Sequence, residues 1–103
     1  MALDYNAVGA AVTDTAFQNR VMGALAAQCI VVNGEAGSTA NHNVRLQLMQ
    51  RIVRDPVSYA QDFAPILASV NPLVGLSSLS VATDAQILTA VQAVFDAFAT
   101  QNI

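Results

Sequence analysis

Residues 14–32 read DTAFQNRVMGALAAQCIVV, and this stretch decides the fold. Placed at 100° per residue, its apolar side chains cover most of a helix circumference. The main polar interruptions are Gln18, Asn19, Arg20 and Gln28. A helix that is apolar nearly all round is a buried helix. We therefore expect it at the centre of the fold or in a contact between subunits, where its alanines and Gly23 allow another helix to approach closely.

Four further helical segments are expected along the chain. A short one covers about 4–12, and another follows a turn-rich segment and covers about 40–54. A fourth begins at Pro56, because proline is tolerated in the first helical turn, and the last spans about 84–100. The sequence thus predicts an all-α fold, a compact bundle of about five helices with short loops, in a single domain over residues 1–103.

Helix ends carry local signals. In a capping box, a threonine and a glutamine three residues later satisfy backbone N–H groups reciprocally. The spacing occurs twice, in Thr15 with Gln18 and in Thr83 with Gln86. Residues 13–14 can cap the earlier helix instead. The fourth helix contains Pro65, where it either continues with a kink or stops.

Residues 71–82 form one longer apolar loop. Asn71-Pro72 marks a turn, and the apolar residues after it have neither a helical nor a strand period: Leu73, Val74, Leu76, Leu79 and Val81. Large apolar surfaces are rare on free monomers and mark contacts. These five side chains are therefore predicted interface residues.

The composition favours a protein with partners. Of the 103 residues 54% are hydrophobic and 11% charged, whereas globular domains are about 25% charged. No membrane segment is expected, because a spanning helix needs about 20 apolar residues and the run over 21–32 is interrupted by Gln28. The N-terminus has no basic region and predicts no signal peptide. The surplus apolar surface predicts protein subunits as partners, with a homo-oligomer first among them.

The third helix carries the most informative charges. Arg45 and His42 fall inside its apolar arc, whereas Arg51 and Arg54 fall outside it. An arginine on an apolar face is costly unless it is paired, so Arg45 should meet an acid, with Glu35 the nearest preceding one, unless it extends to solvent at the edge of the arc. We predict Arg45, Arg51 and Arg54 as interface candidates and His42 and Glu35 as structural polar residues.

The sequence predicts no enzyme. It has neither a glycine-rich phosphate loop nor a Gly-x-Ser-x-Gly elbow. One histidine and one cysteine cannot build a usual zinc site, and Cys29 lies among apolar residues as a small hydrophobe would. No catalytic residue, metal or cofactor is expected. The net charge is −3 with four arginines and no lysine, which argues against nucleic-acid binding through the third helix.

A family resemblance adds to this picture. The chain resembles small helical proteins of tailed bacteriophages, in which a short N-terminal segment precedes a similar Asn-Arg-Val helix. The resemblance spans most of the chain and rests on Phe17-Gln18-Asn19-Arg20-Val21, the alanine-rich helix, Asn41-His42 with Arg45, Asp55-Pro56 and Asn71-Pro72. It implies a virion protein of the head, neck or head–tail joining region, made in the host cytoplasm, with other virion proteins as partners. It implies no catalytic residues.

Two hypotheses follow. The first is a non-enzymatic structural subunit of a multi-copy assembly, which fits the surplus apolar surface. The alternative is a small adaptor or regulatory protein that binds one partner helix in an apolar groove, with residues 73–81 as its lid.

Overall fold

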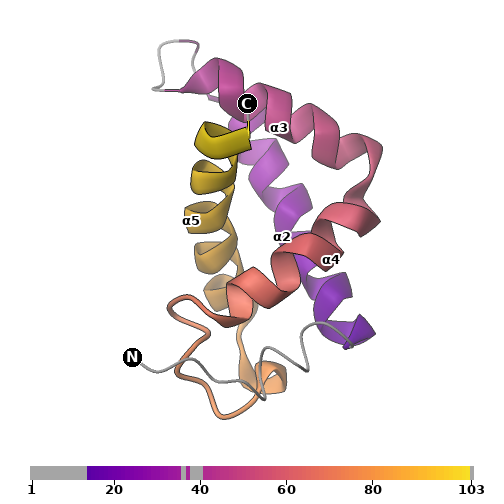
Figure 1. The fold of residues 1–103 in the computed structure, drawn as a ribbon, viewed down its shortest axis with the longest axis vertical. Coiled ribbons are helices and arrows are strands. Elements are labelled where there is room, and N and C mark those ends of the chain that lie inside the picture. The colour runs from indigo at the N-terminus through magenta and orange to yellow at the C-terminus, as the bar shows by residue number, and fades with distance from the viewer. Residues whose placement is uncertain (1–13, 36, 38–40, 103) are drawn as a thin grey trace.

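The computed structural model in Figure 1 describes residues 14–35, 37 and 41–102. Within these residues lie α2 (Thr15–Asn33), α3 (His42–Arg54), α4 (Pro56–Ala68), the short 3-10 helix η1 (Leu79–Val81) and α5 (Asp84–Asn102), and no strand. The all-α class is confirmed. The expected count of about five helices is not, because the described part holds four α-helices. The helix expected over about 4–12 lies outside the described residues.

Helix α2 is the central element, which is the first of the two positions expected for it. It contacts α3, α4 and α5, whereas α3 and α4 barely touch each other. In Figure 1, α2 and α5 run in the same general direction, α3 crosses their upper ends and α4 runs below α3 back toward α5. The side of α2 that carries Val21, Leu25 and Val32 is completely buried, and it packs in one core with Phe63 of α4 and Phe95 of α5.

The starts of α2 and α5 are fixed by side-chain caps. The carboxylate of Asp14 accepts a hydrogen bond from the N–H of Phe17 at 3.1 Å, so Asp14 is the cap of α2 and not Thr15. At α5 the expected capping box is confirmed in both directions. The N–H of Gln86 donates to Thr83 Oγ1 at 3.1 Å, and the N–H of Thr83 donates to Gln86 Oε1 at 2.8 Å.

Helices α3 and α4 meet at a sharp boundary. Asp55 caps α4 by accepting a hydrogen bond from the N–H of Ser58 at 3.2 Å, and Pro56 occupies the first turn. Helix α4 continues through Pro65 as far as Ala68. Helix α3 starts after Asn41, whose φ of 59° is a left-handed conformation that asparagine tolerates.

Candidate functional site

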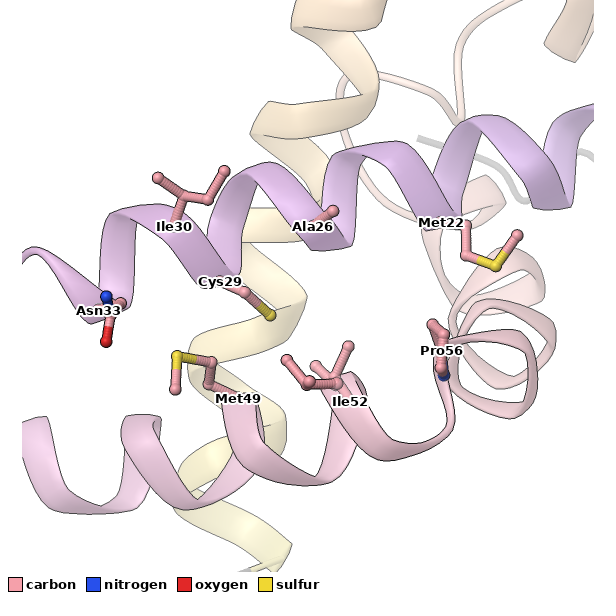
Figure 2. A pocket seen from close by; sticks show the side chains of 9 residues that line it. Met22, Ala26, Cys29, Ile30, Asn33, Met49, Ile52 and Pro56 are labelled. Atoms are coloured by element: carbon pink, nitrogen blue, oxygen red, sulfur yellow. The ribbon is translucent and has the colours of Figure 1, made fainter.

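An apolar groove of about 490 Å³ lies between α2 and α3. Figure 2 shows Cys29 pointing from α2 toward Met49 and Ile52 of α3. None of the side chains that line it is charged: Met22, Ala26, Cys29, Ile30, Asn33, Met49, Ile52, Val53 and Pro56. An apolar hollow of this size with so few polar atoms suits an apolar side chain or helix face of a partner.

The rim of the groove is both apolar and exposed. Ile30 on α2 is 74% exposed and Val53 on α3 is 65% exposed. A smaller hollow of about 180 Å³ between α2 and α4 shares Met22 with the groove and is lined by Val57, which is itself exposed. The groove, Ile30, Val53 and Val57 are called the outer apolar face below. This face crosses three helices, and contiguous apolar surface of this kind marks interaction sites.

Cys29 is part of the groove wall and behaves as the sequence suggests. Its side chain is only 7% exposed, and burial raises the pKa of its thiol above the ordinary value, because a thiolate loses hydration there. A thiol with a raised pKa is a poor nucleophile at neutral pH. Cys29 therefore contributes to the groove as an apolar side chain.

Arg45 is paired inside its own chain. Its Nε and Nη2 atoms each lie 3.0 Å from Oε1 of Glu35, and its Nη1 contacts the carboxylate of Asp96 on α5. The guanidinium also lies over the ring of Phe95, 5.9 Å from its centroid. The sequence prediction that Arg45 meets an acid, with Glu35 nearest, is confirmed. The sequence did not indicate Asp96, because 51 residues separate it from Arg45.

The other polar candidates on α3 are less constrained. Arg51 and Arg54 are exposed in the last turn of α3, where positive charge is favourable at a helix C-terminus. His42 is half-buried at the start of α3, and its Nδ1 is buried without a hydrogen-bond partner among the described residues. The structural role predicted for His42 remains a prediction. The roles of Arg45, Arg51 and Arg54 at an interface remain predictions.

The apolar loop over 71–82 requires a correction. Leu73, Val74 and Leu79 are at most 7% exposed, and Leu76 is partly buried against the same core. These side chains fill the protein's own interior and are not available to a partner. Val81 alone among the five predicted interface residues of this loop is exposed, at 56%. No residue of the loop lines the groove between α2 and α3, so the loop is not its lid.

No group of three His, Cys, Asp or Glu side chains among the described residues could hold a metal ion. None of the helices described has the length and apolar character needed to cross a membrane.

Neither a protein-family model, nor a curated protein, nor a solved structure matches the chain. The outer apolar face is thus the candidate site with the clearest geometry.

Proposed function

We propose that the protein is a non-enzymatic structural subunit that packs against further copies of itself and against other proteins in a multi-copy assembly. One observation carries this proposal. Ile30 and Val53, two large apolar side chains, are 74% and 65% exposed on the rim of a groove without charged lining. Contacts between permanent subunits resemble a divided protein core, and the outer apolar face has this character.

The charge distribution supports the same proposal. Residues 21–34, most of α2, contain no charged residue at all. Interface centres are depleted in charge, and arginine replaces lysine around them. The chain has four arginines and no lysine. Arg20 and Arg45 pair within the chain, and Arg51 and Arg54 stand in the last turn of α3 beside Val53.

The kind of assembly is proposed from the resemblance to small helical proteins of tailed bacteriophages. On this proposal the protein is a virion component of the head, neck or head–tail joining region. Virion components of this kind occur in many symmetric copies, and symmetry repeats one apolar contact around a ring or shell. Mass spectrometry of purified particles tests the proposal directly, because a protein absent from the particle is not a virion component.

Light scattering during size-exclusion chromatography tests the assembly itself. We expect the mass of the wild-type protein to exceed that of one chain and to rise with concentration. Ile30→Asp should return the mass to that of one chain, because a buried charge without a partner is costly. Val81→Asp is the comparison, since Val81 is also an exposed apolar residue but lies outside the groove; an unchanged mass would confine the contact to the groove, and a lowered mass would include the predicted interface residue Val81 in it. A wild-type chain that stays monomeric at high concentration would overturn the proposal.

The groove also favours one alternative, a small adaptor that binds a single partner helix. The groove is of a size to take an apolar helix stripe, although the loop over 71–82 does not cover it. The stoichiometry separates the two functions. A defined one-to-one complex with a different protein, with no self-assembly of the free chain, would favour the adaptor.

A further inference from the structure

Helix α3 has the fewest buried side chains of the four described α-helices. Only Leu48 and Ile52 of its 13 residues are buried. Helix α4 has the same length and buries five side chains, and α2 buries six. The other apolar residues of α3 that face the core, such as Met49, are partly buried. An element with few buried apolar contacts opens at a lower free energy than the whole molecule unfolds.

The contact between α3 and α2 is also incomplete. The groove of about 490 Å³ opens to solvent between these two helices, so their contact there lacks the density of a protein interior. Across it, Cys29 of α2 faces Met49 and Ile52 of α3 (Figure 2). Side chains that line a gap lose dispersion contacts on that side. A movement of α3 away from α2 therefore breaks few contacts across the groove itself, and its main cost is the exposure of Leu48 and Ile52, the two buried side chains of α3.

Arg45 joins α3 to two other parts of the described molecule by charged contacts. Arg45 holds Glu35, which follows α2, through two nitrogens at 3.0 Å, and it reaches Asp96 on α5. Arg45 and Glu35 are only 14% and 16% exposed. Charge-assisted hydrogen bonds that are shielded from water are stronger than ordinary ones, and the ring of Phe95 below the guanidinium adds a cation–π contact.

We propose that α3 can move relative to α2 and so change the width of the groove. The ion pairs of Arg45 with Glu35 and Asp96, called the latch below, hold α3 in place. When the latch is released, α3 moves away from α2, the groove widens, and more apolar surface becomes available. The use of that surface for subunit contacts rests on the proposed function. The movement itself does not, because it depends only on contacts within one chain.

Cys29 provides a built-in probe of this movement. It is the only cysteine in the chain, it is buried, and it lines the groove opposite α3. Alkylation requires access to the thiolate, so iodoacetamide should react slowly with Cys29 at its 7% exposure and faster when α3 has moved or the protein has unfolded. The rate of alkylation, followed by mass spectrometry of the full chain, therefore measures the opening.

The experiment compares Arg45→Met with Arg20→Met. Arg20 is the matched control, because it is also paired, with Asp84 at 2.9 Å and the carbonyl of Ala82 at 2.6 Å, but lies outside the groove. We expect Arg45→Met to accelerate alkylation about tenfold or more, the factor that corresponds to one charge-assisted hydrogen bond. The acceleration should persist unchanged at low urea concentrations, because local opening exposes little surface. Arg20→Met should alkylate near the wild-type rate.

A second, milder variant helps to distinguish local opening from global unfolding. Asp96→Asn removes one of the two acids and leaves the contact with Glu35, and it should accelerate alkylation by a smaller factor. The proposal is overturned if both latch variants alkylate at the wild-type rate. It is equally overturned if their rates rise with urea as steeply as global unfolding does, since Cys29 would then react only in the unfolded chain.

The assembly proposal and the latch proposal can be disproved independently of each other. Alkylation is measured on dilute protein, at concentrations where light scattering detects a single chain. If the protein never assembles but Arg45→Met accelerates alkylation, the assembly proposal fails and the latch stands. If the protein assembles through Ile30 but the alkylation rate is insensitive to Arg45, the latch fails and the assembly stands.

Discussion

The loop over residues 71–82 and the side of α2 that carries Ile30, called the outer side of α2 below, are both rich in apolar residues. They differ in whether those residues are buried. Leu73 and Leu79 of the loop are at most 4% exposed, whereas Ile30 of α2 is 74% exposed. An irregular backbone can turn each side chain inward separately. A regular helix distributes side chains around its whole circumference, so a helix that is apolar nearly all round keeps an exposed stripe unless neighbours surround it.

The largest expected effect tests this comparison directly. Leu73→Ala should lower the free energy of unfolding by about 3 kcal/mol, because it removes a fully buried side chain and leaves a cavity. Ile30→Ala should change it by no more than about 0.5 kcal/mol in the dilute monomer, as surface substitutions do. Urea denaturation of both variants measures the difference. Equal losses would mean that the loop and the outer side of α2 are buried to the same degree.

The second effect concerns the charged contact that joins α3 to α5. Arg45→Ala should lower the free energy of unfolding by about 2 kcal/mol, less than for a fully buried pair, because Asp96 is 58% exposed and regains hydration. Thermal and urea denaturation measure the loss. Arg54→Ala on the same helix is the control and should be close to neutral. A neutral Arg45→Ala would show that the ion pairs contribute nothing to stability.

The third effect lies where the loop ends and α5 begins. Thr83→Ala should cost about 1 kcal/mol, the usual value for a lost helix cap, because the N–H of Gln86 loses its acceptor Thr83 Oγ1. Thr89→Ala, an exposed threonine within α5, is the control and should not destabilise the protein. If Thr83→Ala is neutral in urea denaturation, the capping box does not hold the end of the loop.

The smallest expected effect is a gain in stability from a substitution on the outer side of α2. Gly23 is exposed, and an added Cβ would meet no atom within 4 Å. Gly23→Ala should therefore stabilise the dilute monomer by about 0.5–1 kcal/mol through the helix preference of alanine. Circular dichroism during urea denaturation measures the gain. A loss of stability instead would mean that another element already packs closely against this side of α2.

Local signals in the sequence were the most reliable guides to the fold. The capping box at Thr83 and the Asp55-Pro56 boundary were predictable because they depend on neighbouring residues. The central position of α2 followed from its apolar circumference. The apolar arc of α3 also predicted that Arg45 would pair with an acid.

Features that depend on distant residues could not be predicted. Nothing near Arg45 in the sequence indicates Asp96 on α5. The loop at 71–82 was assigned to an interface because a single sequence cannot show whether an apolar loop folds over its own core. An apolar groove could be suggested from the sequence but not placed for the same reason, since its position depends on how α2 and α3 meet. Pro65 left two outcomes open, and the structure shows that α4 continues through it.

The absence of charge over residues 21–34, which include most of α2, determines how a contact made through this surface should respond to temperature and salt. A contact made through this surface has no ion pairs to fix the angle of the neighbour, so neighbours related by slightly different rotations can be accepted. Its strength should change little with ionic strength, because there are few charges to screen. Its apolar character should make it weaker in the cold than at room temperature.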